Sequence, residues 1–172
     1  MKLHIGSRQA REGWKTFDIV PGPEVDFTGD CKDLSQFAEG SVETIYASHV
    51  LEHVPYNREM TKTLRGWFRV LKPGGTAMIS VPDLETLCRL FLHPQLTPEN
   101  RFEVMRVMFG GQLDAHDFHY AGFDWNILSS FLGKAGFDRI ARVKEFGLFE
   151  DTSAMKVGGV PISLNVTARK PG

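Results

Sequence analysis

Two hydrophobic periods alternate along this 172-residue chain. Short runs of apolar and β-branched residues are typical of buried strands, whereas apolar residues at three- and four-residue steps are typical of amphipathic helices. The short runs predict strands at Lys2–Ile5, Lys15–Val20, Val25–Thr28, Val42–Ala47, Thr76–Val81, Arg139–Lys144 and Ser163–Ala168. The longer period predicts helices at Asn57–Val70, Leu84–Leu92, Pro98–Phe109 and Trp125–Lys134, with one helical turn at Leu34–Phe37.

The order of these elements predicts the fold class. Strands that alternate with helices favour an α/β fold in which a mostly parallel sheet carries helices on both faces. The last two strands are separated by a long loop, Glu145–Ile162, which is typical of an antiparallel excursion and favours one reversed strand. No repeat, linker or low-complexity tract divides the chain, so we expect a single domain over residues 1–172.

Composition narrows the range of partners. The chain has 20 Lys and Arg residues and 21 Asp and Glu residues, which gives a net charge of −1. This balance shows no excess of positive charge of the kind that binds nucleic acid. No apolar run approaches the roughly 18–20 residues that span a bilayer, and the N-terminus lacks the pattern of a signal peptide. Cys31 and Cys88 lie far apart without the spacing of a metal motif, so they indicate neither a disulfide framework nor a zinc site. We therefore expect a cytoplasmic protein that binds neither nucleic acid nor a membrane.

Polar side chains follow the buried strand at Val42–Ala47. Ser48, His49, Glu52 and His53 occupy the turn between this strand and the next helix. In open parallel sheets, ligands bind just outside the carboxyl ends of the strands, so chemistry is expected here. For Glu52 and His53 we expect a role in orienting the strand–helix junction.

Several short motifs follow one another in a distinctive order: Leu3-His4-Ile5-Gly6, Phe17-Asp18-Ile19, Gly29-Asp30-Cys31, Ala47-Ser48-His49-Val50-Leu51-Glu52-His53, Leu71-Lys72-Pro73-Gly74-Gly75 and Ala135-Gly136-Phe137. In this series the chain resembles the class I S-adenosylmethionine-dependent methyltransferases, specifically the small type 11 kind. The resemblance implies a Rossmann-like seven-stranded sheet in the order 3-2-1-4-5-7-6, with strand 7 antiparallel. It also implies S-adenosylmethionine as the cofactor.

The resemblance assigns the first cofactor-binding residues to the ends of the first two strands. Gly6 would let the backbone pass close to the cofactor, because a side chain there would collide with it. The family's Gly-x-Gly is replaced here by Gly6-Ser7-Arg8, and Arg8 could either reach the cofactor carboxylate or fill the pocket. Asp18 would accept hydrogen bonds from both ribose hydroxyls.

Further cofactor contacts are implied at the next two strand ends. Asp30 would accept the exocyclic amine of adenine, and the Cys31 N–H would bond a ring nitrogen. The competing interpretation of Asp30 is a cap of the turn that follows it. Ser48 and His49 would line the methionine end of the pocket.

The irregular stretch from Gly110 to Tyr120 is rich in Asp, His and aromatic residues. Histidine titrates near neutrality, so His119 and His116 are the candidate general bases for a hydroxyl or amine acceptor. Together with Asp114 and Asp117 they could instead hold a metal ion, but no third ligand lies at a suitable spacing, and we expect no metal. Methyl transfer by direct displacement can also proceed through orientation of the reactants alone.

The expected function is therefore methyl transfer to a small-molecule or sugar-like acceptor. The helical stretch Pro98–Gly111 could form a lid or the face of a homodimer. One alternative is a catalytically silent domain that binds a nucleoside-type ligand or a protein partner. A nicotinamide-dependent oxidoreductase is disfavoured, because the residues after Gly6 lack the spaced glycines that cradle a pyrophosphate.

Overall fold

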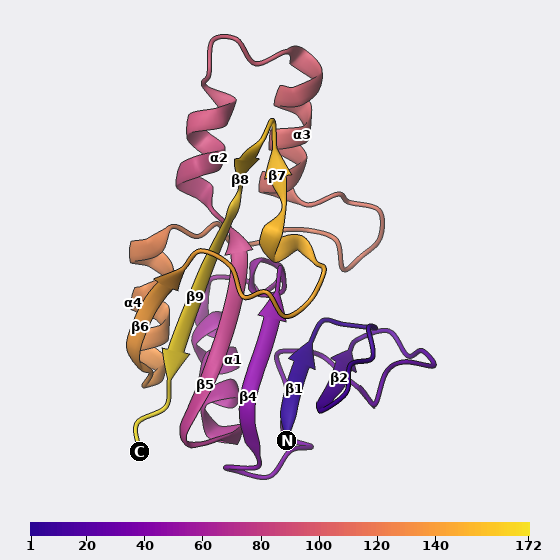
Figure 1. The fold of residues 1–172 in the computed structure, drawn as a ribbon, viewed down its shortest axis with the longest axis vertical. Coiled ribbons are helices and arrows are strands. Elements are labelled where there is room, and N and C mark those ends of the chain that lie inside the picture. Colours follow the sequence, from indigo (N-terminus) through magenta and orange to yellow (C-terminus); the bar gives the residue numbers. More distant parts are fainter.

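The computed structural model covers residues 1–172 and contains one seven-stranded sheet (Figure 1). Its strands are β1 (Lys2–Ile5), β2 (Trp14–Asp18), β3 (Phe27–Thr28), β4 (Val42–Ser48), β5 (Leu71–Pro82), β6 (Asp138–Val143) and β9 (Ser163–Arg169). They lie in the order β3-β2-β1-β4-β5-β9-β6, and β9 runs antiparallel to both of its neighbours. The predicted strand order and the reversed strand are confirmed.

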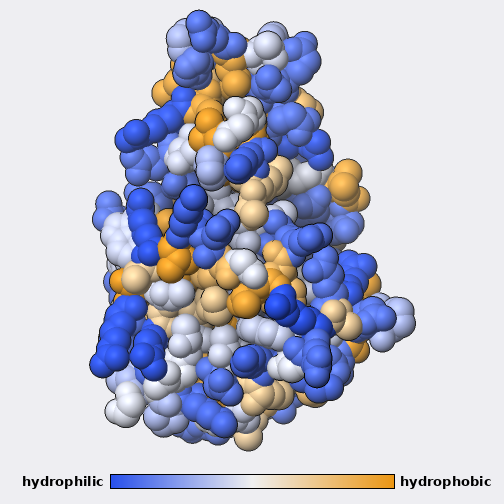
Figure 2. Space-filling model, viewed as in Figure 1, coloured by the Kyte–Doolittle hydropathy of each residue, from blue (hydrophilic) through white to orange (hydrophobic).

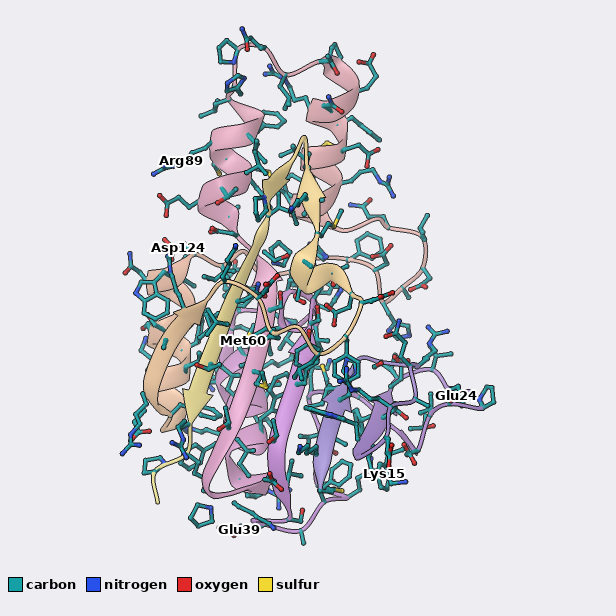
Figure 3. All side chains as sticks on the ribbon, in the orientation of Figure 1. Lys15, Glu24, Glu39, Met60, Arg89 and Asp124 are labelled. Carbon is teal, nitrogen blue, oxygen red and sulfur yellow. The ribbon has the colours of Figure 1, made fainter.

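The helices lie where the 3.6-residue period predicts them. They are α1 (Arg58–Val70), α2 (Leu84–Phe91), α3 (Pro98–Phe109) and α4 (Trp125–Ala135), with 3-10 turns η1 (Leu51–His53) and η2 (Thr152–Ala154). Asn57 caps the start of α1, and Asp124, labelled in Figure 3, accepts the Ile127 N–H at the start of α4. These caps satisfy backbone donors that the first helical turn leaves free.

The segment Leu34–Phe37 forms one isolated turn, as predicted, in which the Phe37 N–H donates to the Leu34 carbonyl. One local prediction needs correction. The strand predicted at Thr76–Val81 begins earlier, because Leu71 already pairs with Val42 before an irregularity in the ladder.

One face of the sheet packs against α1 and α4. Met60, Leu64 and Trp67 of α1 are fully buried in the same core cluster as Ile5 and Ile45 of the central strands. In Figure 1, α1 lies behind the sheet. The spacing of these three residues on α1 places them on one side of the helix, which explains why this side faces the sheet.

The opposite face is covered by an irregular segment, so the prediction of helices on both faces is wrong for this face. The connections from β1 to β2 and from β2 to β3 are too short for a crossover of the dozen or more residues that holds a helix. The long loop expected between the last two strands crosses this face instead (Figure 1) and contains η2 and a small hairpin, β7 (Lys156–Val157) and β8 (Val160–Pro161). The Tyr46 hydroxyl donates to Asp151 at 2.7 Å, and the Asn165 side-chain amide donates to the Ser153 carbonyl at 3.0 Å.

Helices α2 and α3 form a hairpin that projects beyond the carboxyl end of β5 (Figure 1). A small core of Leu87, Val104 and Ile162 holds it against the residues that precede β9. Hydrophobic residues also reach the surface on this hairpin, where Figure 2 shows orange patches; Phe102 and Phe109 are more than half exposed. None of the helices combines the length and the hydropathy that a bilayer crossing requires.

Candidate functional site

A cavity of about 400 Å³ lies at the carboxyl ends of β1, β2 and β4. This volume is within the range of small-ligand pockets, and the position is the one at which open parallel sheets bind ligands. Among the residues that line it are Gly6, Arg8, Asp18, Asp30, Cys31, His49 and His116. Of the nine predicted site residues, only Ser48 and His119 are absent from its wall.

The first wall of the cavity is the tight turn after β1. Gly6 has a φ of 75°, and a Cβ at this position would overlap the side chain of Val50. The Gly6 N–H donates to the Phe17 carbonyl at 2.7 Å, which ties this turn to β2. Glycine is therefore required here both by the backbone conformation and by the close approach of the neighbouring chain.

Asp18 and Arg8 form an ion pair at the end of β2. The Arg8 Nε lies 3.6 Å from Asp18 Oδ1, and the Val20 N–H donates to the same oxygen at 2.8 Å. The Asp18 side chain is 11% exposed, whereas that of Arg8 is 61% exposed. Arg8 therefore lies over the carboxylate at the mouth of the cavity, mostly in solvent, and leaves the interior of the cavity open.

Asp30 and Cys31 form a turn that is anchored to α1. Asp30 Oδ1 accepts the Lys32 N–H at 2.9 Å, so this side chain caps its own turn while it also lines the cavity. The indole N–H of Trp67 donates to the Cys31 carbonyl at 2.8 Å, and no hydrogen bond within the chain uses the Cys31 N–H. Burial raises the pKa of the Cys31 thiol to about 12, so this thiol is neutral and not a nucleophile.

Ser48 and His49 lie on different sides of the end of β4. The Ser48 hydroxyl lies 3.0 Å from that of Thr152 in η2, away from the cavity. His49 has a φ of 53° and lines the cavity, with its Nε2 at 2.9 Å from the Ser163 hydroxyl. Burial lowers the pKa of His49 to about 4, so the ring is neutral near neutral pH.

Behind this wall lies a buried polar cluster. Glu52 has no exposed surface, and neither of its carboxylate oxygens has a hydrogen-bond partner. His49 Nδ1 lies 3.5 Å and His119 Nε2 4.0 Å from Glu52 Oε1, and the rings of His53 and His119 meet edge to face at 4.8 Å. Burial raises the pKa of Glu52 to about 8 and lowers the pKa values of His53 and His119. The sequence gives no sign that His119 contacts Glu52.

The stretch from Gly110 to Tyr120 supplies the outer wall. Asp114, His116 and Asp117 line the cavity, and Asp114 Oδ1 accepts the His116 N–H at 2.7 Å. The His116 side chain is exposed there, whereas the His119 side chain is 10% exposed and faces Glu52.

Several wall residues were not predicted from the sequence. Ile19 and Val20 follow Asp18 directly, and their partly exposed apolar side chains line the cavity. Lys32 and Tyr120 also line it and contribute polar groups. The signal for Ile19 and Val20 was available, because the apolar run of β2 continues past the strand end to Pro21. For Tyr120 the sequence carries no such signal.

A family model described as a methyltransferase domain matches residues 8–79, which contain β2 to β4 and most of β5. Comparison with curated proteins gave no match.

Solved structures with the same fold span nearly the whole chain. A possible exported protein from Bordetella parapertussis matches 99% of it with a TM-score of 0.59 and 14% identity, and the chain spans 62% of that protein. An S-adenosylmethionine-dependent methyltransferase from Mesorhizobium loti matches 98% of the chain with a TM-score of 0.62 and 16% identity, over 90% of its own length.

A third similar structure was solved with two bound ligands. The 1,6-didemethyltoxoflavin N1-methyltransferase from Burkholderia thailandensis, solved with 1,6-didemethyltoxoflavin and S-adenosylhomocysteine, matches 99% of the chain. Its TM-score is 0.60 and its identity 16%, over 71% of its length. At these identities the structures confirm the predicted fold.

Proposed function

Because this chain has the fold of the class I S-adenosylmethionine-dependent methyltransferases and its residues 8–79 match their domain model, we propose that it transfers a methyl group from S-adenosylmethionine to a small-molecule acceptor. The observation that carries the proposal is the cavity in which Gly6, Asp18 and Asp30, from three successive strand ends, share one wall. Polar groups at this edge of a parallel sheet are the usual means of holding a nucleoside.

The adenosine part of the cofactor would be held by the second and third strand ends. Asp18 would accept the ribose hydroxyls, and Asp30 Oδ2, which lies 3.4 Å from Lys32 Nζ, would accept the adenine amine. The free Cys31 N–H would donate to a ring nitrogen. Ile19 and Val20 would offer apolar contact to the purine. This donor and acceptor set fits an adenosine.

The methionine part would lie toward Gly6, Arg8 and His49. The exposed guanidinium of Arg8 can pair with a carboxylate in a charge-assisted bond. Neutral His49 lines the cavity there, and Ser48 would act only through its contact with Thr152. When bound, the cofactor supplies an electrophilic methyl group on a sulfonium, which a direct displacement transfers to an oriented acceptor.

The acceptor would lie against the stretch from Gly110 to Tyr120. His116 lines the cavity and is the first candidate for removing the acceptor's proton; His119 is the second, from its position beside Glu52. The polar groups of Asp114, His116 and Asp117 would suit an acceptor with several hydroxyls, such as a sugar-like metabolite. We propose a cytoplasmic reaction and, from the exposed aromatic residues of α3, a homodimer.

Calorimetric titration with S-adenosylmethionine and S-adenosylhomocysteine tests the proposal. We expect micromolar binding, weakened about 10- to 100-fold in Asp18→Ala, because a hydrogen bond to a charged group contributes about 1.5–3 kcal/mol. Asp138→Ala on β6, an exposed acid far from the cavity, is the matched control and should bind like the wild type.

Other outcomes decide between the alternatives. If the folded wild-type protein binds neither compound, the proposed function is wrong and the silent-domain alternative takes its place. Binding of NAD instead of S-adenosylmethionine would favour the oxidoreductase.

A further inference from the structure

We propose that Glu52, His53 and His119 form a zinc site at the wall of the cavity. One ligand atom from each side chain, a carboxylate oxygen and two imidazole nitrogens, lies within 4.8 Å of the others. Two of these residues belong to η1 and the third comes from the stretch after α3. Of the residues that the sequence suggested for a metal, only His119 belongs to this set, and the tertiary structure brings Glu52 and His53 to it.

Backbone hydrogen bonds hold these two segments together. The Glu52 carbonyl accepts the N–H groups of Tyr120 and Ala121 at 2.7 and 3.1 Å. The His119 N–H donates to the Phe109 carbonyl at 3.1 Å, which fixes this residue to the end of α3. The relative position of the three ligands is thus set by the main chain, as a preorganised site requires.

The Glu52 carboxylate points independently to a ligand. It is fully buried, and both of its oxygens lack a hydrogen-bond partner. The separations of 3.5 Å to His49 Nδ1 and 4.0 Å to His119 Nε2 are too long for good hydrogen bonds. Buried carboxylates in proteins are paired, hydrogen-bonded or bound to a metal. A cation between these side chains would supply the missing partner.

His53 already has the arrangement of a metal ligand. Its Nδ1 lies 3.1 Å from the Phe118 carbonyl, and a carbonyl can only accept, so this nitrogen carries the proton and donates. The lone pair is then on Nε2. Histidines that bind metals characteristically donate their other N–H to a carbonyl or carboxylate, which fixes both the tautomer and the direction of the ring.

The ligand set selects zinc over the commoner hard cations. Mg²⁺ and Ca²⁺ prefer all-oxygen sites, whereas two histidines and one glutamate are an established zinc set that leaves a fourth position open. The ligand atoms of a tetrahedral zinc ion lie roughly 3–3.5 Å apart. The separations within the set, up to 4.8 Å overall and 4.0 Å between Glu52 and His119, must therefore close by roughly 0.5–1.5 Å through inward rotation of the side chains.

The ion would lie beside the acceptor end of the cavity, because His53 also lines it. An acceptor hydroxyl bound at the open position would lose its proton more easily, since zinc lowers the pKa of its oxygen ligands. In this arrangement His119 is a ligand and His116 takes the proton. This role of zinc rests on the proposed function, whereas zinc binding itself does not.

The test is calorimetric titration of chelator-stripped protein with ZnCl₂ alone, accompanied by thermal unfolding. We expect one Zn²⁺ per chain and a rise in melting temperature on its addition. Glu52→Gln and His119→Gln should each weaken binding about 100-fold, since even the outer partners of a zinc site contribute 10- to 100-fold. His93→Gln, an exposed histidine between α2 and α3, is the matched control and should bind like the wild type.

Equal zinc affinity in the wild type and in folded Glu52→Gln or His119→Gln, or no binding by the wild type, would overturn the proposal. Should circular dichroism show that these variants do not fold, His53→Gln, whose side chain is partly exposed, takes their place. A parallel titration of the stripped protein with S-adenosylhomocysteine separates the two proposals. Zinc binding without cofactor binding would refute the proposed function and support the zinc site. Cofactor binding without zinc binding would support the proposed function and refute the zinc site.

Discussion

At the scale of single residues, the cavity depends on unusual backbone conformations at two strand ends. Gly6 follows β1 with a φ of 75°, and His49 follows β4 with a φ of 53°. The His49 N–H donates to the Ser80 carbonyl at 2.9 Å, and its ring contacts Ser163, so hydrogen bonds compensate for the left-handed conformation. Such conformations are concentrated at functional sites because the surrounding structure must enforce them.

Substitution of Gly6 tests how closely the chain packs at this point. Gly6→Ala should lower the free energy of unfolding by about 2–4 kcal/mol, because the left-handed φ and the overlap with Val50 both oppose a Cβ. Gly13 has a similar φ of 78° with open space around it, so Gly13→Ala should lose only about 1 kcal/mol. Urea unfolding measures both values; equal losses would show that the overlap with Val50 has no energetic effect.

At the scale of elements, α1 positions the side of the cavity that is formed by Asp30 and Cys31. Its buried face carries Trp67, whose indole N–H bonds the Cys31 carbonyl. Arg69 of the same helix donates to the carbonyls of Leu34 and Phe37 at 2.9 and 3.0 Å. The segment after β3 has no regular secondary structure, so its position depends on these contacts with the helix.

Trp67→Phe should therefore affect both stability and binding. The variant leaves the partly buried Cys31 carbonyl without its donor, which should lower the free energy of unfolding by about 1–3 kcal/mol and weaken binding of S-adenosylhomocysteine. Trp14→Phe on β2, whose ring lies on the opposite face against Phe149, is the control. Urea unfolding and calorimetry measure the two effects. Unchanged binding in folded Trp67→Phe would mean that α1 does not set the geometry of this turn.

At the scale of the whole molecule, the two faces of the sheet are stabilised by different means. The face against α1 and α4 is an aliphatic and aromatic core. The face under the segment between β6 and β9 buries His4, whose ring lies 4.0 Å from that of Phe149 and 4.9 Å from that of Tyr46. Burial lowers the pKa of His4 to about 4, against 6.5 for the free side chain.

This shift predicts an acid-sensitive fold. Between pH 6.5 and about 4 the unfolded chain binds a proton at His4 that the folded chain does not, so stability falls as the pH falls through this window. A shift of this size corresponds to about 3 kcal/mol. For His4→Phe, the free energy of unfolding, measured by urea unfolding, should therefore decrease less between pH 7 and pH 4 than that of the wild type.

The exposed His93 again provides the comparison. His93→Gln should keep the acid sensitivity of the wild type, because its ring has solvent access in the folded chain. If the free energy of unfolding of His4→Phe has the same pH dependence as that of the wild type, His4 is not the cause of the acid sensitivity.

Much of the fold could be predicted because it depends on local spacing. Met60, Leu64 and Trp67 follow the period of a helix, and the predicted strands end at Ile5, Val20 and Thr28, within two residues of Gly6, Asp18 and Asp30. In a parallel sheet all such ends meet at one edge, so the placement of these three residues around one cavity followed from the order of the elements. The extent of β5 was missed because Pro73 and Gly74 indicate a turn, although Leu71 still pairs with β4.

The sequence by itself therefore determined the elements and the edge at which a ligand would bind, and its resemblance to a known family implied their order in the sheet. Only the tertiary structure decided that His119 lies beside Glu52, that Ser48 turns away from the cavity, and that an irregular segment covers the second face. The physical reason is that a periodic pattern records which residues of one element share a face. It does not record which residue of a distant irregular segment is packed against them, because that contact depends on the path of the chain in space.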